Sequence, residues 1–451
     1  MRLWTSVLIV ALFIGASGLA AQERVLLLEG GTLIDGTDRA PVADAVVLVE
    51  GSRITAVGTR GQVRYPSNAD VIKLNGRTIL PGLIDGHVHL RDWQLPMFLP
   101  HGVTTIADLH NDTAWSIAQR EALKSGKTNG PRFFVSGARV TGPLGDPTTD
   151  GSYVRDVAEA RAYVRSLAKA GVDHIKVDLT ITDDQLRAVI EEGNAVGLKV
   201  LGHTQNIKKA VDMGMKHMEH MDTMARALLE QEGKDPRPAG TTSEAAVNTK
   251  LYPPLIDYMV KQGVYVNPTL VLHWGAGSQR WLDQVALAAL LVKDPSLAFV
   301  PAEVKAAWTR QPRARAGYAN IAEFLKKYSD AGGKILAATD TGCSVCDQII
   351  PGLSLHYEMQ MLVDMGIPPI RALQGATLWA AEVLGQEKDL GSVQVGKLAD
   401  FTIIEGNRLA DIGATKNVRM VIKGGKVINT TYDPAWVNPI PRRVGTAAQG
   451  R

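Results

Sequence analysis

Short apolar runs alternate with longer amphipathic segments through the middle of the chain. In residues 156–170, Val157, Ala160, Val164 and Leu167 recur at helical spacing, and residues 183–196 follow the same pattern. Eight apolar runs are typical of strands: residues 80–90, 104–108, 132–136, 172–178, 198–203, 217–220, 264–268 and 334–340. Alternation of eight such strands with helices predicts an α/β fold, a (β/α)8 TIM barrel over residues 79–390.

The two ends of the chain follow another pattern. Residues 25–71 and 400–427 carry short β-branched runs separated by turn pairs such as Gly30-Gly31 and Gly424-Gly425, which predicts antiparallel strands. Their similarity predicts a small composite β-sandwich domain, residues 22–78 and 391–440, into which the barrel is inserted. The long connection 274–332 contains helical stretches at 281–292 and 302–308. It is interpreted as a lid, a packing insertion or an oligomer contact.

The first residues indicate export. Met1-Arg2 gives a positive start, residues 3–19 are almost wholly apolar, and Ala20-Ala21 supplies small residues. This pattern predicts a signal peptide over residues 1–21, and therefore a secreted or periplasmic protein that has no membrane association after cleavage. An uncleaved anchor is the alternative, but the run is short for a membrane span.

Net charge limits the classes of binding partner, and the two cysteines indicate a disulfide. The 451 residues carry a formal net charge of only +3 with dispersed basic residues, which argues against a nucleic-acid partner or an anionic membrane. Cys343 and Cys346 are the two cysteines. They could form a redox pair or half of a metal site, but export favours a disulfide.

Six polar residues stand at or near the ends of predicted strands. His87 and His89 alternate with Val88, so both imidazoles lie on one face. Later strands contribute the rest of the set: Lys176, His203, His220 and Asp340. In a (β/α)8 barrel the carboxyl ends of the strands meet at one mouth. One zinc ion needs three protein ligands and an open position, so six groups fit two metal ions better than one.

These residues occur in motifs that resemble the amidohydrolase superfamily. The motifs are Pro81-Gly82-Leu83-Ile84-Asp85-Gly86-His87-Val88-His89, Ile175-Lys176-Val177, Gly202-His203, Met218-Glu219-His220, Ala338-Thr339-Asp340 and the closing run at 391–401. The runs at 102–108 and 351–358 look like the imidazolonepropionase-like and prolidase-like branch of that superfamily.

The resemblance implies a binuclear centre with two divalent ions, zinc by default. His87, His89 and Asp340 would hold the buried ion, His203 and His220 the outer one, and N6-carboxylated Lys176 would bridge them. A free ammonium would repel cations, whereas a carbamate supplies anionic oxygens. A salt bridge between Lys176 and Asp178 is the alternative.

Two metal ions provide hydroxide near neutral pH, and catalytic Asp340 would pass a proton to the leaving amine. The implied reaction is hydrolysis of an amide or peptide bond in a small carboxylate-bearing substrate: a dipeptide, an Xaa-Pro dipeptide or an N-acyl amino acid. Arg139 or Arg91 could bind the carboxylate, and His273 is a further candidate substrate contact.

Two other functions stay open. A mononuclear cyclic-amide hydrolase or deaminase of the imidazolonepropionase type would not need Lys176, and a non-catalytic metal-binding homologue is the third reading. A homo-oligomer is also compatible with the sequence. The remaining histidines are interpreted as structural: His101, His110, His174, His217 and His356.

Overall fold

The computed structural model describes residues 24–147, 152–235, 244–273, 279–310, 316–343, 346–406 and 411–442. The predicted signal peptide, residues 1–21, lies outside the described residues. Within the described ranges, no helix combines the length and apolarity that a membrane crossing needs.

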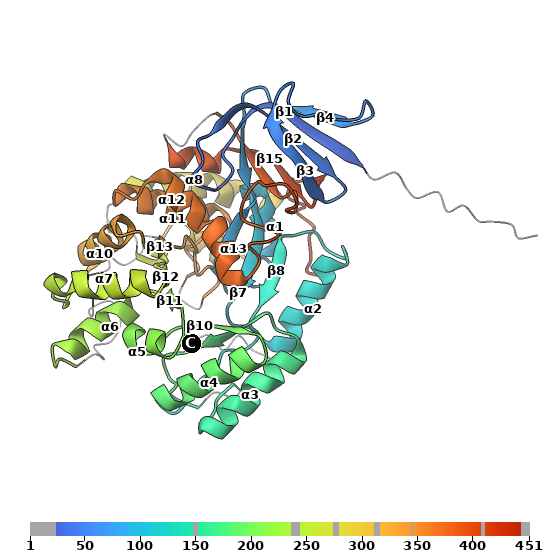
Figure 1. Ribbon diagram of the computed structural model, residues 1–451. Coiled ribbons are helices and arrows are strands. Elements are labelled where there is room, and N and C mark those ends of the chain that lie inside the picture. Colours follow the sequence, from blue (N-terminus) through green and yellow to red (C-terminus); the bar gives the residue numbers. More distant parts are fainter. Residues whose placement is uncertain are drawn as a thin grey trace, which may run out of the picture.

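The two ends of the chain build one eight-stranded sheet. Its strands are β1 (Val25–Leu33), β2 (Val42–Glu50), β3 (Arg53–Thr59), β4 (Asp70–Lys73), β5 (Thr78–Pro81), β14 (Phe401–Ile404), β15 (Val418–Lys423) and β16 (Lys426–Val427). They are hydrogen-bonded in the order β16-β15-β14-β5-β1-β2-β3, with β4 beside β1. The junction between the two ends is the antiparallel pair β5–β14, in which Leu80 lies opposite Thr402. Figure 1 shows this sheet at one side of the helical body.

Apolar side chains explain why the ends come together. Leu26 and Leu28 of β1 share one face of the strand, where they belong to the same buried cluster as Val47 of β2 and Phe401 of β14. Leu27 points to the opposite face and packs in a different cluster. Because this inner face contains residues from both ends, neither end can bury its apolar surface without the other.

Eight parallel strands occupy the middle of the chain, and each overlaps one range predicted from the sequence. They are β6 (Leu83–Val88), β7 (Val103–Asp108), β8 (Arg132–Val135), β9 (His174–Val177), β10 (Lys199–Gly202), β11 (His217–Glu219), β12 (Tyr265–Asn267) and β13 (Lys334–Ile335). They pair as β6-β7-β8, β10-β9 and β11-β12-β13. Further backbone hydrogen bonds join these sheets, from Val140 N to Lys176 O and from Asp340 N to His87 O, each 2.8 Å.

The predicted opening strand, residues 80–90, is wrong as a single element. The chain breaks at Gly82, so β5 pairs with β14 whereas β6 pairs with β7. A Cβ at residue 82 would collide with the side chain of Thr104 in β7. Glycine has no Cβ, so the chain can pass close to β7 at this point. The last strand is also shorter than predicted, since regular pairing covers only Lys334–Ile335.

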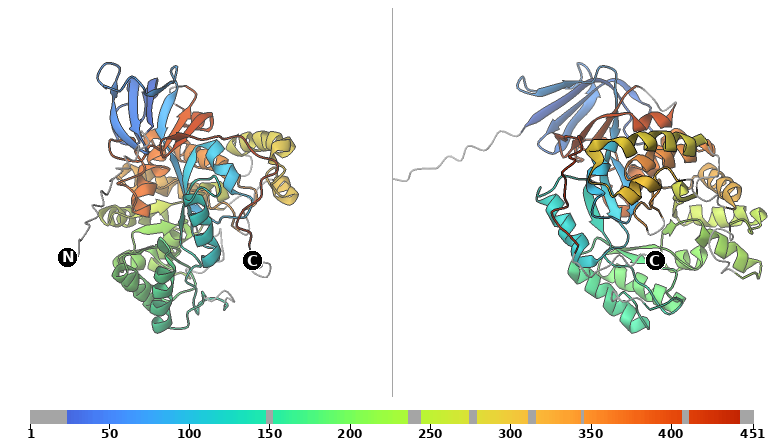
Figure 2. Two further views of the ribbon diagram at one scale, coloured as in Figure 1. Left: turned by 90° about the vertical axis from the view of Figure 1, so that its right-hand side faces the viewer. Right: turned by 180° about the vertical axis from the view of Figure 1, so that it is seen from behind.

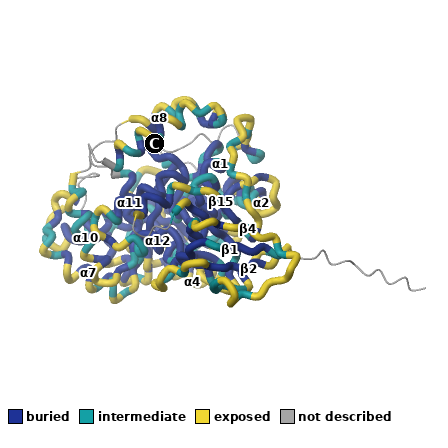
Figure 3. Tube along the Cα trace, turned by 90° about the horizontal axis from the view of Figure 1, so that it is seen from above, coloured by how far each residue is buried: buried dark blue, intermediate teal, exposed yellow. Residues whose placement is uncertain are grey.

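Helices surround the parallel strands, with exposed faces outward and buried strands inside (Figures 2 and 3). They are α1 (Leu95–Phe98), α2 (Thr113–Lys124), α3 (Val157–Ala170), α4 (Asp183–Ala195), α5 (Ile207–Asp212), α6 (Asp222–Gln231), α7 (Tyr252–Lys261), α8 (Gln279–Lys293), α9 (Ala302–Ala307), α10 (Tyr318–Asp330), α11 (Leu353–Asp364), α12 (Pro369–Gly375) and α13 (Leu378–Leu384). The predicted helices at 156–170 and 183–196 are confirmed. Asp156 caps α3, and Thr182 with Gln185 forms a capping box at α4.

The long connection after β12 packs into the body through aromatic residues. Trp308, after α9, is fully buried with its ring 6.3 Å from that of Trp93. Phe299 contacts Tyr432 and Trp436 of the C-terminal segment. The described part of this insertion therefore has a packing role.

Candidate metal centre

The six predicted site residues lie at the carboxyl ends of the parallel strands. His87 and Lys176 are within β6 and β9, and His203 directly follows β10. His220 and Asp340 have left-handed backbone conformations, with φ of 60° and 58°. Such a conformation is unfavourable for a side-chain-bearing residue, and here backbone hydrogen bonds from His220 N to Asn267 O and from Asp340 N to His87 O hold it.

The structure brings the six side chains together in one cluster, with Asp340 near its centre. Its Oδ1 lies 3.2 Å from His87 Nε2 and 3.0 Å from His89 Nε2, and its Oδ2 lies 3.7 Å from His220 Nε2. Lys176 Nζ is 3.5 Å from His87 Nε2. The His203 and His220 ring centroids are 4.6 Å apart. Residues from five strand ends thus share one site.

The outward nitrogens of three imidazoles are held by acceptors. His87 Nδ1 lies 2.6 Å from Glu219 Oε2, and His89 Nδ1 lies 3.3 Å from His110 O. A carboxylate and a carbonyl only accept, so both Nδ1 atoms carry the proton. Thr269 Oγ1, 2.6 Å from His220 Nδ1, donates its own hydrogen to Pro268 O and therefore accepts from His220. All three Nε2 atoms then present lone pairs.

These lone pairs converge on a carboxylate, which is the arrangement that a cation requires. Asp340 Oδ1 is buried and makes no hydrogen bond with any described residue, although two Nε2 atoms are about as close as a bonded donor would be. Imidazole nitrogens and carboxylate oxygens are common ligands of divalent ions. His87, His220 and Asp340 each offer a ligand atom within 4.8 Å of the others. The donor set fits a metal ion.

Burial keeps the imidazoles of His203 and His220 neutral. Burial lowers the pKa of His220 to about 3 and that of His203 well below its usual range. Burial also lowers the pKa of the Lys176 ammonium. For Asp340, burial raises the pKa of the carboxyl, but positive charge on the neighbouring His87 and His89 rings would lower it by more, and a bound cation would act in the same direction.

Three residues that orient the imidazoles were missed by the sequence analysis: Glu219, Asn267 and Thr269. Glu219 is fully buried and accepts from His87 Nδ1 and Asn267 Nδ2, each at 2.6 Å. A signal did exist, because Glu219 lies between Met218 and His220 in a strand that must be buried, and a buried carboxylate needs partners.

The candidate substrate contacts are only partly described. Arg139 forms an ion pair with Asp178 at 3.2 Å, so Asp178 is paired with Arg139 as well as lying near Lys176. Arg91 donates to Gly342 O and Cys343 O and thereby holds the loop that carries the Cys343–Cys346 disulfide. The side chain of His273 lies outside the described residues. The disulfide interpretation of the two cysteines is confirmed.

The histidines interpreted as structural fall in four places. His174 is buried in β9, and His356 bonds to Thr415 and His101 O near the sheet built by the chain ends. His110 lies beside the site, where its Nδ1 accepts from Arg139 N and its carbonyl orients His89. His217 begins β11, at the strand end remote from Asp340.

A cluster of neutral imidazoles and one ionised carboxylate at the carboxyl ends of parallel strands defines a metal-binding α/β protein. Residues 78–428 match the amidohydrolase family model, so the chain belongs to the amidohydrolase family, whose members are metal-dependent hydrolytic enzymes acting on C–N bonds. The expected relation to its imidazolonepropionase-like and prolidase-like members is confirmed.

Individual relatives are distant. The chain is 23% identical to an imidazolonepropionase of Geobacillus thermodenitrificans, covering 86% of this chain and 90% of the relative. It is also 23% identical to an adenine deaminase of Rubrobacter xylanophilus, over 91% of this chain but only 60% of that protein's length. A solved Xaa-Pro dipeptidase with bound methionine shares the fold, with a TM-score of 0.66 and 24% identity over 90% of this chain and 99% of that one. The family and this neighbour imply a TIM-barrel-type fold.

Proposed function

We propose that the protein is a binuclear amidohydrolase in which His87, His89 and Asp340 hold one metal ion and His203 and His220 the other. The observation that carries the proposal is the convergence of three Nε2 lone pairs on Asp340, with each Nδ1 held by an acceptor. Zinc is the ion that such nitrogen-rich ligands favour.

Lys176 is proposed to be N6-carboxylated and to bridge the two ions. Its side chain is 1% exposed, and burial lowers its pKa, which favours the neutral amine that reacts with carbon dioxide. In that reaction the nitrogen forms a bond to carbon and loses a proton, leaving an anionic carbamate. The product supplies negative charge where a buried ammonium would oppose cations.

The proposed reaction is hydrolysis of an amide or peptide bond. When bound, the metal ions supply Lewis acidity to a water molecule and to the substrate carbonyl. Asp340 is ionised and lies among the proposed ligands, so it can accept the proton of the attacking water and deliver it to the leaving amine. A dipeptide, an Xaa-Pro dipeptide or an N-acyl amino acid is the proposed substrate, in line with the Xaa-Pro dipeptidase neighbour.

A mononuclear cyclic-amide hydrolase or deaminase is the second candidate. The observation in its favour is that His87, His220 and Asp340 alone bring three ligand atoms within 4.8 Å of one another, enough for one ion. The matched relatives include an imidazolonepropionase and an adenine deaminase.

Metal content coupled to a hydrolysis screen separates the two. We expect two ions per chain in the wild-type enzyme by elemental analysis, one in Lys176→Ala, and two in the control Lys326→Ala, whose exposed lysine pairs with Asp330. Dipeptides, N-acyl amino acids, cyclic amides and aminopurines form the substrate panel. One ion per chain in all three proteins, with turnover of cyclic amides or aminopurines only, would establish the mononuclear enzyme instead.

We further propose that the eight parallel strands close into a (β/α)8 barrel over residues 79–390, with residues 22–78 and 391–440 as a composite β-sandwich domain. The hydrogen bonds that join the three parallel sheets support the barrel, and the shared apolar cluster supports the β-sandwich domain.

Export after cleavage near residue 21 is also proposed. A mature N-terminus near Gln22 by mass spectrometry is the expected result, and an intact Met1 in the exported fraction would contradict it.

A further inference from the structure

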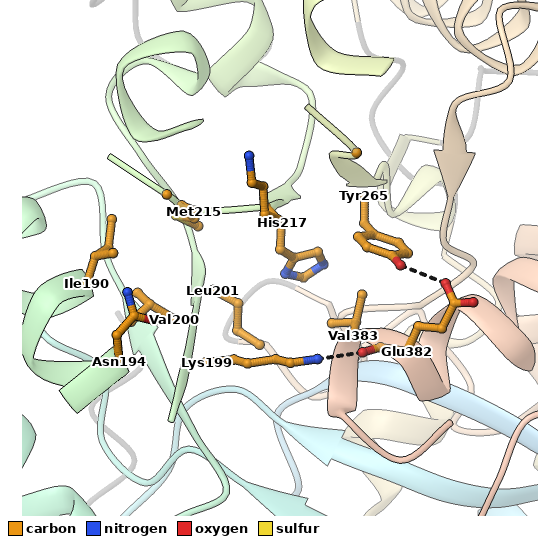
Figure 4. Close-up of a pocket in the computed structure, with 13 residues that line it drawn as sticks. Ile190, Asn194, Lys199, Val200, Leu201, Met215, His217, Tyr265, Glu382 and Val383 are labelled. Carbon is orange, nitrogen blue, oxygen red and sulfur yellow. Dashed lines mark hydrogen bonds between the residues drawn. The ribbon is translucent and has the colours of Figure 1, made fainter. Parts of the chain in front are cut away.

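A cavity of about 310 Å³ lies at the amino ends of the parallel strands, opposite the metal centre. Lys199, His217 and Tyr265, the first residues of β10, β11 and β12, line it together with parts of α4 and α13 (Figure 4). Its walls are largely apolar, and its volume is at the lower end of the range for small-molecule sites.

The buried polar group of this cavity is His217. The residue is 5% exposed, and neither ring nitrogen hydrogen-bonds to any described residue. Figure 4 shows the ring among Leu201, Tyr265 and Val383. Burial lowers the pKa of His217 to about 4, so the neutral ring offers one donor and one acceptor. The nearest carboxylate oxygen, Glu219 Oε1, is 3.5 Å from Nε2 and makes no hydrogen bond with it, so a molecule that hydrogen-bonds to the ring would satisfy a buried polar group.

Positive charge lies beside this histidine. Lys199 Nζ donates one hydrogen bond to the Glu382 carbonyl at 2.6 Å and has two further protons. The Glu382 carboxylate is engaged elsewhere, by Tyr265 Oη and Lys334 Nζ, each at 2.6 Å. Lys334 therefore balances the charge of Glu382, and the Lys199 ammonium faces the cavity without a carboxylate of its own in the described structure.

We propose that this cavity is a second binding site, for a small monocarboxylic acid with an apolar body. Lys199 pairs with the carboxylate, which also accepts a hydrogen bond from the imidazole of His217. The apolar body packs against Leu201, Met215 and Val383, which line the same space. The combination of one cation, one neutral donor and apolar walls favours this class over a phosphate, for which a single lysine is a poor match.

The site is also linked to the metal centre. His217 Nε2 lies 3.5 Å from Glu219 Oε1, and Glu219 holds His87 through its other oxygen. A ligand carboxylate that accepts the Nδ1 hydrogen of His217 leaves a lone pair on Nε2, and this lone pair faces and repels Glu219 Oε1. Occupancy of the cavity therefore acts on the carboxylate that orients His87.

Calorimetric titration of the metal-loaded enzyme with phenylacetate tests the proposal. We expect Lys199→Met to weaken binding at least about tenfold, since a charged hydrogen bond is lost. Lys209→Met is the matched control, because this exposed lysine pairs with Glu230 on another surface, and it should bind as the wild type does. Val383→Trp fills the cavity and should abolish binding.

Two further measurements keep the test decisive if a variant fails to fold. Phenylacetamide, a neutral analogue of the same shape, should bind the wild-type enzyme at least about tenfold more weakly than phenylacetate. Imidazole nitrogen NMR should show the His217 tautomer becoming fixed on titration. Equal binding of the two probes, equal binding to Lys199→Met, or unchanged His217 signals would overturn the proposal.

Discussion

Strand β11 has one histidine at its amino end and another just beyond its carboxyl end. Both are buried, but they differ in their hydrogen-bond partners. His220, just beyond the carboxyl end, has its Nδ1 held by Thr269 and its Nε2 aimed at Asp340. His217, at the amino end, makes no hydrogen bond through either nitrogen to a described residue. Burial lowers the pKa of both, to about 3 and about 4, so both rings are neutral.

Neutrality alone therefore does not make an imidazole a metal ligand. An imidazole whose Nδ1 is held presents one lone pair in one direction, as metal binding requires. An imidazole without such a partner can exchange tautomers and orientation, which suits an exchangeable molecule. The following predictions test whether the partners of the two rings determine this division.

The largest effect is expected at the carboxylate toward which the held rings point. Asp340→Asn removes both the proton acceptor and an anionic ligand, so kcat/KM should fall by about 10⁴-fold. The amine-release assay with the best substrate of the screen measures it. Asp330→Asn, an exposed residue paired with Lys326, is the control and should change kcat/KM little.

The second prediction concerns the hydrogen bond from His87 Nδ1 to Glu219. Glu219→Gln keeps the shape but loses the charge that accepts from His87 Nδ1, and metal affinity should fall about 10- to 100-fold. Glu358→Gln is a matched control, since Glu358 is equally buried but accepts from Leu270 N and Val271 N. Competition with a metal-binding dye measures both. Equal losses in the two variants would mean that replacing any buried carboxyl group lowers metal affinity, whether or not it contacts His87.

A smaller loss is expected from the hydroxyl that holds His220. Thr269→Val removes the acceptor of the His220 proton with little change of shape, and metal affinity should fall about tenfold. Thr269→Ser restores a hydroxyl and should recover most of it. If Val and Ser behave alike, the held Nδ1 is not what distinguishes His220 from His217.

The smallest effect concerns the ring without partners. The unfolded chain protonates His217 near its ordinary pKa, whereas the folded chain does so only near 4, so its contribution to stability is present above pH 6.5 and is lost as the pH falls toward 4. His217→Asn should therefore lose about 1 kcal/mol less unfolding free energy than the wild type between pH 7.5 and 5.5. Denaturant titrations at both pH values measure this; parallel curves would contradict it.

Strand alternation and strand-end position were enough to select, from the sequence, the six residues that the structure brings together. Two histidines spaced as His87 and His89 share a face, and His203 and His220 each follow an apolar run directly. These are local features, and the parallel arrangement brings them together. Eight strands were predicted for the same reason, because each is a compact apolar run.

The groups that orient the imidazoles depend on register between strands, which local patterns do not contain. Asn267 reaches Glu219 because the two residues are paired across β11 and β12. Thr269 itself has a left-handed backbone conformation, which places its hydroxyl beside His220 and which the sequence pattern does not predict. The break at Gly82 was missed although Pro81-Gly82 interrupts the apolar run, because the apolar residues on both sides hide a change of partner from β14 to β7.

The pairing of Leu80 with Thr402 has a consequence for how the protein is made. A ribosome synthesises the first strands of that sheet long before their partners exist, so the sheet cannot be completed until translation is almost finished. In nascent chains β5 can pair with β1, but its other edge stays unpaired, and any premature stop before β14 leaves that edge open for association with other chains.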